Sequence, residues 1–345
     1  MVTREDELYM RRALELALRG RGYASPNPLV GCVIVKNGQI LGEGWHRKYG
    51  EAHAEVNAIS AVRDKEALKD ASMYVTLEPC AHTGKTPPCA RLIIQYPFKN
   101  VFIANTDPNP LVNGKGIELI KQAGIDVVTG VLEQTGYEIN ARFFTCIQKQ
   151  RPYIVLKWAE TADGFIARDD YSSKWISNRL SRTLVHKWRS EEDAVMVGGR
   201  TAHYDNPALN VREWNGRNPV RIVLDRNLSL APDLRLFDQT QQTICYNEVR
   251  SEIAGNIIFV KLDKGTEQLR QLMTDLYQRK IQSVIVEGGA VLLNAFLSMG
   301  LWDEIRRFKS NEVYFGSGIA APRYYRAPDE SVWLRSDRLD IFKNT

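Results

Sequence analysis

The chain has 345 residues, of which 44% are hydrophobic and 25% are charged. Such a composition is typical of a soluble globular protein, and the length predicts two domains. The formal net charge of +5 comes without a long basic run, so the chain gives no support for a nucleic-acid groove and only weakly favours an anionic small ligand.

The N-terminal stretch predicts an amphipathic helix over Glu5 to Arg19, because its apolar side chains recur at helical spacing. A secretory signal would need a continuous apolar region there, and the chain has no run of about eighteen apolar residues that would span a membrane. The five cysteines are scattered and do not form the pattern of a disulfide framework. We therefore expect a cytoplasmic protein without a membrane partner.

The first half predicts an α/β domain. Asn37-Gly38 is the strongest hairpin signal in the chain and joins a strand over Val30–Lys36 to one over Gln39–Trp45. Further strands are expected at Met73–Thr76, Asn100–Ala104 and Asp126–Thr129, with helices starting at His53 and running over Asn113–Ala123 and Leu132–Gln148. This alternation predicts a three-layer domain around a mostly parallel sheet.

The stretch from Glu51 to Cys89 contains a metal-binding pattern. His53, Cys80 and Cys89 offer one imidazole and two thiolates, which suit zinc and leave a fourth position for water. Glu55 follows His53 by two positions, and a carboxylate beside such a water can take its proton and pass it on. The order H-x-E, then P-C…C, is the signature of zinc-dependent base deaminases, although here residues 81–88 separate the cysteines.

Longer motifs in the first half are more specific. PNPLVG, GEAHAEVNAIS, TLEPCAHTGKTPPC and TDPNPLVNGKG together resemble the deaminase half of the bifunctional deaminase–reductases of riboflavin biosynthesis. The resemblance implies a cytidine-deaminase-like domain that deaminates 2,5-diamino-6-ribosylamino-4(3H)-pyrimidinone 5′-phosphate, with Glu55 as its proton shuttle. It implies substrate contacts from Asn27, His46, His82, Lys85 and Thr86. From spacing alone, Asn27 is better explained as a turn residue between two prolines.

A polar segment over 148–152 separates the two halves, and Pro152 ends any helix before it. We therefore expect domains over 1–148 and 149–345. In the second, strands are predicted at Tyr153–Ala159, Asp193–Val197, Val220–Leu224, Thr243–Tyr246, Ile257–Val260 and Ser283–Val286, and helices at Ser177–Ser190, Thr266–Arg279 and Val291–Met299.

The second half has no G-x-G-x-x-G fingerprint for a dinucleotide. Two glycine pairs, Gly198-Gly199 and Gly288-Gly289, each follow a predicted strand and precede a helix. Backbone at such a place can approach a phosphate closely, and a helix N-terminus favours an anion. A glycine pair alone is weak evidence, because most are simple turns.

In the second half, too, longer motifs are more specific than the spacing of single residues. LKWAETADGFIA, SSKWIS, TAHYDNPALNVR and VEGGAVLLNAFL resemble the reductase half of the same family, which implies a dihydrofolate-reductase-like α/β fold and reduction of the ribosyl group to ribityl by NADPH. The implied cofactor residues are Ala159, Trp175, Thr201, Asp205, Gly288 and Gly289. The implied substrate residues are Ser173, Arg189, Leu209, Arg212 and Glu287. Arg189 and Arg212 can clamp a phosphate, and a homo-oligomer, dimer or tetramer, is expected.

The chain departs from this family in two places. Arg226 stands where many relatives have a small hydroxyl residue, and it either meets the 2′-phosphate of NADPH or is merely exposed. After Asp303-Glu304-Ile305, relatives continue with an apolar strand, whereas this chain has the charged segment Arg306–Ser310. The resemblance is therefore weakest over the last segment of the chain, from Arg306 onward.

Three other functions stay open at this point. A nucleoside or nucleic-acid deaminase with an accessory domain would need a different pocket or an aromatic–basic channel, and no aromatic–basic run marks the latter. A zinc-stabilised binding or scaffold protein would keep its role after Glu55→Gln. A deaminase with a decayed reductase half would release ammonia without consuming NADPH.

Overall fold

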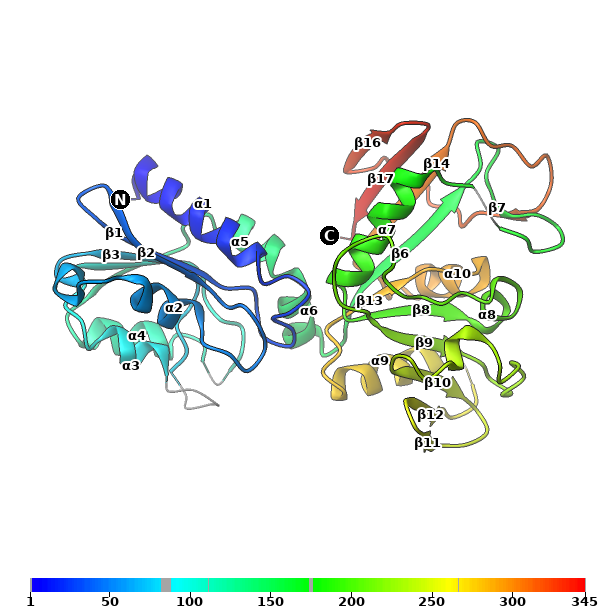
Figure 1. The fold of residues 1–345 in the computed structure, drawn as a ribbon, viewed down its shortest axis with the longest axis horizontal. Coiled ribbons are helices and arrows are strands. Elements are labelled where there is room, and N and C mark those ends of the chain that lie inside the picture. The colour runs from blue at the N-terminus through cyan, green and yellow to red at the C-terminus, as the bar shows by residue number, and fades with distance from the viewer. Residues whose placement is uncertain (1, 82–87, 111, 174–175, 266, 345) are drawn as a thin grey trace. The chain divides into compact units, whose positions relative to one another are not determined.

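A computed structural model describes residues 2–81, 88–110, 112–173, 176–265 and 267–344 of the chain. These residues divide into two compact units, Met1–Gln150 and Arg151–Thr345, and each is described by itself (Figure 1). Among the described residues, no helix has the length and apolar character needed to cross a membrane. His82, Lys85, Thr86 and Trp175, which the sequence assigned to substrate or cofactor, lie outside the described residues.

The first unit is built around one sheet. Its strands are β1 (Gly31–Lys36), β2 (Gln39–Trp45), β3 (Ser72–Leu77), β4 (Asn100–Asn105) and β5 (Asp126–Thr129). Its helices are α1 (Arg4–Leu18), α2 (Ala54–Ala61), α3 (Cys89–Ile93), α4 (Lys115–Gln122), α5 (Glu133–Ile139) and α6 (Ala141–Lys149), with the 3-10 helix η1 (Lys65–Leu68). In the described part of this unit the strand order is β2-β1-β3-β4-β5.

This sheet is mixed, and the prediction of a mostly parallel sheet was wrong. Strand β1 pairs antiparallel with both β2 and β3, whereas β3, β4 and β5 are parallel to one another. The hairpin at Asn37-Gly38, where both residues have left-handed backbone, reverses the chain. The chain then crosses through α2 and η1 to the other side of β1, so β3 runs in the direction of β2.

Helices cover both faces of the first sheet (Figure 1). On one face, apolar residues of α1 such as Met10 and Leu14 pack on Val33 and Val35 of β1. On the other face, α2, α3 and α4 pack on Cys32 and Ile34 of the same strand. Because Cys32 to Val35 of β1 point alternately to opposite faces and are all buried, the strand lies in the middle layer of three.

Two local features place the segments that carry the site. A Cβ on Gly44 of β2 would lie 2.4 Å from Ala54 O and from Ala58 N, so only glycine lets α2 rest directly on this strand. The single helix predicted over Leu132–Gln148 is divided into α5 and α6 at Asn140. The buried side chain of Asn140 bonds to the backbone of Leu29.

The second unit has a larger sheet. Its strands are β6 (Tyr153–Glu160), β8 (Ala194–Gly198), β9 (Val220–Leu224), β10 (Thr243–Asn247), β11 (Glu252–Ala254), β12 (Ile257–Lys261), β13 (Ser283–Val286), β14 (Glu304–Ser310), β16 (Glu330–Leu334) and β17 (Asp337–Lys343). Strands β7 (Phe165–Ala167) and β15 (Ile319–Ala320) pair separately. Its helices are α7 (Arg179–Glu191), α8 (Gly199–Asp205), α9 (Gln268–Gln278) and α10 (Ala290–Ser298), with the 3-10 helix η2 (Arg235–Phe237).

Among the residues described, the strand order is β11-β12-β10-β9-β8-β13-β6-β14-β17-β16. The strands from β12 to β14 in this order are parallel, and β11, β17 and β16 add antiparallel edges. Helices α9 and α10 pack on one face, where Leu272 and Phe296 join the main core with Ile154. Trp188 of α7 stacks on Phe308 at a ring distance of 5.5 Å.

The charged segment that departs from the family pattern is nevertheless a strand inside the sheet. In β14, Arg306 donates to Glu304 at 2.6 Å and lies 4.4 Å over the ring of Trp188. Arg307 donates to Asp340 of β17 at 2.8 Å. Because each guanidinium has a carboxylate partner, the strand can be buried despite its charge.

Candidate functional site

The three expected zinc ligands meet in the first unit. His53 immediately precedes α2, Cys80 lies in the loop after β3, and Cys89 is the first residue of α3. His53 Nδ1 lies 3.7 Å from Cys80 Sγ and 3.3 Å from Cys89 Sγ, and all three ligand atoms are within 4.8 Å of one another. Tetrahedral zinc bonded to one nitrogen and one sulfur places those two atoms about 3.6 Å apart. The three side chains therefore fit a zinc ion.

The two thiols and the imidazole lie close enough to change one another's pKa. Cys80 Sγ accepts the backbone N–H of Cys89 at 3.3 Å, at the start of α3. The Cys89 side chain and the His53 ring lower the pKa of the Cys80 thiol, and the Cys80 side chain and burial raise the pKa of Cys89. The bond to Cys80 raises the pKa of His53. Together these groups form a set in which bound metal replaces protons.

Glu55 lies beside this cluster in the first turn of α2. It is only 3% exposed, and burial raises the pKa of its carboxyl group. A carboxyl group with a raised pKa can both accept and return a proton near neutral pH. The position next to three zinc ligands is the one that proton transfer to and from a metal-activated water requires.

His46 and Asn27 extend the site. Asn27 Nδ2 is 3.0 Å from His46 Nε2, and His46 Nδ1 is 3.1 Å from Ala52 O. Because the amide donates to Nε2, the ring is the tautomer whose Nδ1 carries the proton and donates to Ala52 O. Burial lowers the pKa of His46, in keeping with a neutral ring. Its ring meets that of His53 edge-on at 5.4 Å.

The loop that carries Asn27 is held by a residue far away in the chain. Asn140 Oδ1 accepts the N–H of Leu29 at 2.7 Å, and Asn140 Nδ2 donates to Leu29 O at 2.9 Å. Sequence reasoning missed Asn140, because the signal is only an asparagine inside a predicted helix. These two bonds fix the backbone two residues beyond Asn27.

Sequence reasoning also missed Glu78, which lies next to the zinc loop. Its buried carboxylate accepts the backbone N–H groups of Asp107, Gly114 and Gly116 at 3.2, 3.0 and 3.0 Å. The signal in the sequence is a glutamate between an apolar strand and Pro79. Glu78 thereby joins the loop before Cys80 to the loop that starts with Asp107.

In the second unit, a buried charged cluster lies at the carboxyl ends of β6 and β13. Arg189 of α7 donates to both oxygens of Glu287 at 2.6 and 2.8 Å, and Lys157 Nζ lies 3.5 Å from Glu287. Burial by itself would raise the pKa of Glu287, but Arg189 and Lys157 lower it to about 2. Sequence reasoning missed Lys157, although a lysine in an otherwise apolar strand is a visible signal.

The predicted phosphate clamp has a more complex environment than its sequence suggested. Arg189 is already paired with Glu287, and its Nη1 donates to Asn210 O at 3.2 Å. Arg212 is exposed, and its Nη1 donates to the side chain of the same Asn210 at 3.2 Å. Both guanidinium groups thus bond to Asn210, Arg189 through a side chain that is 11% exposed and Arg212 through an exposed one.

Several expected cofactor and substrate residues come together at the same sheet edge. Ser173 Oγ donates to Asp205 at 3.0 Å. A Cβ on Gly288 would lie 2.9 Å from Thr201 Cγ2, so the glycine turn packs directly on Thr201. Gly289 has left-handed backbone and precedes α10, whose first turn has no capping side chain among the described residues. Uncapped N–H groups at this turn fit a phosphate group of a nucleotide cofactor.

The remaining residues of the second unit that the sequence singled out are Ala159, Leu209 and Arg226. Ala159 lies on β6 opposite Phe308 of β14. Leu209 is buried and has a φ of 47°. Arg226 is largely exposed, with its Nε 4.0 Å from a carboxylate oxygen of Glu248.

Comparison with known proteins matches both units. Residues 3–105 match the cytidine and deoxycytidylate deaminase zinc-binding region, and residues 152–311 match the RibD C-terminal domain. The chain is 40% identical over 347 residues to riboflavin biosynthesis protein RibD of Aquifex aeolicus, covering 99% of this chain and 96% of that protein. It is 38% identical over 318 residues to the RibD protein of Escherichia coli, covering 87% and 86%.

Solved structures agree over the whole length. A diaminohydroxyphosphoribosylaminopyrimidine deaminase/5-amino-6-(5-phosphoribosylamino)uracil reductase of Thermotoga maritima is similar with a TM-score of 0.89 at 38% identity, covering 99% of each chain. A RibD structure of Acinetobacter baumannii is similar with a TM-score of 0.90 at 34% identity, with the same coverage.

Proposed function

This chain belongs to the RibD family of bifunctional riboflavin biosynthesis enzymes, and on that premise we propose how its residues divide the two reactions. Residues 1–148 deaminate 2,5-diamino-6-ribosylamino-4(3H)-pyrimidinone 5′-phosphate. Residues 149–345 then reduce the ribosyl group of the product to a ribityl group with NADPH. The observation that carries the proposal is the His53, Cys80 and Cys89 cluster beside buried Glu55, in a chain that matches this family over its whole length.

In the deaminase unit, His53, Cys80 and Cys89 would hold zinc, which when bound activates a water for attack on the ring carbon that bears the amino group. The Glu55 carboxylate takes the proton released by the water and returns it to the departing ammonia. Burial of Glu55, which raises its pKa, supports this role in both directions of transfer.

Around the pyrimidine, we assign recognition to Asn27, His46, His82, Lys85 and Thr86. Asn27 donates to His46 through Nδ2, which directs its Oδ1 toward a donor on the substrate ring. The bonds from Asn140 to Leu29 hold this loop in place before substrate arrives. Such preorganisation reduces the entropy lost on binding.

In the reductase unit, NADPH when bound supplies the hydride. We assign cofactor binding to Ala159, Trp175, Thr201, Asp205, Gly288 and Gly289. We assign substrate binding to Ser173, Arg189, Leu209, Arg212 and Glu287. Arg189, Glu287 and Lys157 form a hydrogen-bonded set in which Arg189 and Lys157 lower the pKa of Glu287, and this set can orient the hydroxyl groups of an opened ribose.

These assignments have an open edge of a parallel sheet in common. Glu287 directly follows β13, and its N–H bonds to Met196 O of the neighbouring β8. Ligands of open α/β sheets bind outside the carboxyl ends of the strands. The position of Glu287, Gly288 and Thr201 at this edge supports a cofactor and substrate crevice there.

We further propose that the protein acts in the cytoplasm as a homo-oligomer, either a dimer or a tetramer. Light scattering coupled to size-exclusion chromatography measures the mass of the assembly and distinguishes these states from a monomer.

A coupled assay tests the two activities together. Zinc-loaded protein is given the phosphorylated diaminopyrimidinone and NADPH, and the release of ammonia and the loss of NADPH absorbance are followed in one reaction. We expect ammonia first and NADPH loss after it. Ammonia without NADPH loss would restrict the proposal to the first unit. Failure of folded, zinc-loaded protein to release ammonia would overturn the substrate, and free nucleosides would be tested next.

A further inference from the structure

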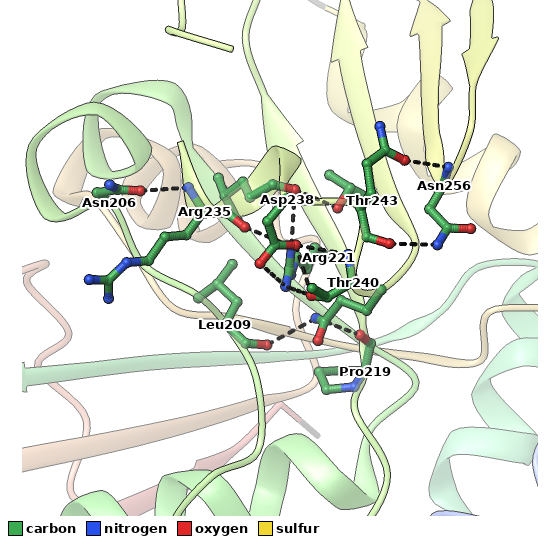
Figure 2. A network of polar contacts seen from close by, with 12 residues as sticks. Asn206, Leu209, Pro219, Arg221, Arg235, Asp238, Thr240, Thr243 and Asn256 are labelled. Atoms are coloured by element: carbon green, nitrogen blue, oxygen red, sulfur yellow. Dashed lines mark hydrogen bonds and ion pairs between the residues drawn. The ribbon is translucent and has the colours of Figure 1, made fainter. Parts of the chain in front are cut away.

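A buried arginine organises one end of the reductase unit (Figure 2). Arg221 on β9 is only 1% exposed. Its Nη1 donates to the carbonyl oxygens of Arg235 and Leu236 at 2.8 and 3.2 Å and to Asp238 Oδ1 at 2.7 Å. Its Nη2 donates to Thr240 Oγ1 at 3.0 Å. One side chain thus supplies hydrogen bonds to most of the loop over 235–240.

The same loop is fixed from its other side. Thr243 Oγ1 donates to Leu236 O at 2.7 Å, and Asn256 Nδ2 donates to Gln239 O at 2.7 Å. A buried guanidinium is costly unless its hydrogen bonds are made, so Arg221 and its acceptors hold one another in a single arrangement. The hydrogen bonds leave this loop little conformational freedom.

The loop over 235–240 and the adjacent Gln241 form hydrogen bonds with the segment that follows α8. Asn206 Oδ1 accepts the backbone N–H of Arg235 at 2.8 Å, and Gln241 Nε2 donates to Leu209 O at 3.4 Å and to Pro219 O at 3.2 Å. Figure 2 shows these contacts on either side of Arg221. Asn206 is therefore bonded to the loop that Arg221 holds, and Leu209 is bonded to Gln241, the residue directly after that loop.

Asn206 and Leu209 also have unusual backbone. Their φ angles are 40° and 47°, in the left-handed region, which asparagine enters more readily than other residues with a side chain and leucine enters only rarely. Asp205, the residue before Asn206, bonds to Ser173. The hydrogen bonds to Arg235 and Gln241 supply the contacts that this backbone needs.

We propose that the Arg221 network positions the segment 205–209 for NADPH binding, which makes Arg221 and Asn206 positioning residues of the reductase. Neither residue needs to touch the cofactor. The inference rests on the proposed assignment of Asp205 to the cofactor and of Leu209 to the substrate. In addition, we infer that Arg221 fixes the backbone geometry of these two residues through the loop over 235–240 and the adjacent Gln241.

Two variants of Asn206 separate the bond from the backbone conformation. Asn206→Gly adopts the left-handed backbone easily but loses the bond to Arg235, whereas Asn206→Asp keeps an acceptor oxygen and tolerates the same backbone. The dissociation constant for NADPH, measured by the fluorescence of the bound cofactor, is expected to rise about three- to tenfold in Asn206→Gly. In Asn206→Asp it is expected to stay close to the wild-type value.

Arg221→Lys tests the centre of the network, since lysine cannot reach the carbonyl groups and Asp238 together. Arg217→Lys is its matched control. Arg217 also bridges an aspartate, Asp193, at 2.8 Å, but it lies before β9, at the amino ends of these strands. We expect Arg221→Lys to raise the KM for NADPH with kcat nearly unchanged, and Arg217→Lys to lower thermal stability without changing the KM.

All variants are measured well below their unfolding temperatures, with deaminase activity of the same full-length chain as a control for the amount of folded protein. Equal NADPH affinity in folded wild type and Asn206→Gly would overturn the positioning role, as would an equal loss in Asn206→Asp. Asp205→Ala is measured in parallel. If it weakens NADPH binding while Asn206→Gly does not, only the positioning role falls; if neither does, the assignment of Asp205 to the cofactor falls too.

Discussion

At the scale of single residues, the two sites use buried carboxylates in opposite ways. Burial raises the pKa of Glu55, which suits the proton transfer that we propose for it. In the second unit, the cations of Arg189 and Lys157 outweigh burial and lower the pKa of Glu287 to about 2. Glu287 therefore stays charged and orients neighbours, and it does not transfer protons near neutral pH.

The role of Glu55 leads to a prediction about its amide variant. Glu55→Gln keeps the size of the side chain but cannot take a proton, so deamination is expected to fall by about 10²- to 10⁴-fold. Bound zinc, measured by atomic emission, is expected to remain at the wild-type level because Glu55 is not a ligand. NADPH oxidation with pre-deaminated substrate serves as the control, and undiminished ammonia release would contradict the assignment.

The lowered pKa of Glu287 predicts a pH dependence of stability. Its folded-state value of about 2 lies below the ordinary 4.5, so its stabilising contribution is complete above pH 4.5 and is lost as pH falls toward 2. The difference in unfolding free energy between wild type and Glu287→Gln is expected to shrink over that range.

Urea unfolding at a series of pH values measures this difference. The Glu304→Gln variant is a control elsewhere in the same unit, since Glu304 pairs with Arg306 outside the Glu287 cluster. A difference for Glu287→Gln that stays constant from pH 5 to 2 would show that the carboxylate is not held ionised by its neighbours.

At the scale of elements, both sites depend on segments that leave regular structure. Helix α2 begins directly after His53 and α3 begins at Cys89, so two zinc ligands lie at helix starts. The interruption between α5 and α6 at Asn140 releases an amide to hold the loop at Leu29. In the reductase unit, the backbone at Asn206 departs from helix and is held by the loop over 235–240.

The Asn140 contact can be tested through the deaminase reaction. Asn140→Ala removes both bonds from this buried side chain to the backbone of half-buried Leu29 and is expected to destabilise the unit by about 1–3 kcal/mol. We also expect a higher KM for the pyrimidine with zinc content unchanged, because the Asn27 loop loses its support. Asn100→Ala is the matched control, since its amide bonds to Ser72 at the other end of the strands. An unchanged KM in folded Asn140→Ala would contradict this role.

At the scale of the whole molecule, each unit has its own buried core. The clusters around Ile34 and Val33 belong to the first unit, and the cluster around Ile154 belongs to the second. In each unit one of the assigned side chains follows the carboxyl end of a strand, Cys80 after β3 and Glu287 after β13. The two reactions therefore depend on separate folded units within one chain.

Zinc removal is expected to affect only the first unit. The metal would link the start of α2, the loop after β3 and the start of α3, so chelation should lower the unfolding temperature of the first unit and abolish deamination. Calorimetry before and after chelation measures the shift, and adding zinc back should reverse it. NADPH oxidation with pre-deaminated substrate is expected to continue; its loss on chelation would contradict this independence.

Local patterns in the sequence were enough for most elements and for the chemistry of the zinc cluster. The hairpin at Asn37-Gly38 follows from backbone preferences of those two residues, and the strand over Val220–Leu224 follows from a short apolar run. His53, Cys80 and Cys89 could be predicted as zinc ligands because imidazole and thiolate groups are ligands that zinc prefers. The function came from longer motifs, which the family comparison supports.

Tertiary structure decided what depends on contacts between distant parts of the chain. The antiparallel pairing of β1 with β3 and the hydrogen bonds between Asn140 and Leu29 join residues far apart in sequence. The contacts of Arg306 with Trp188 and of Arg221 with Asp238 do the same. Local propensity contains no information on such partners. A buried charge or amide is costly unless it finds hydrogen-bond partners, and those partners are brought together only once the chain has folded.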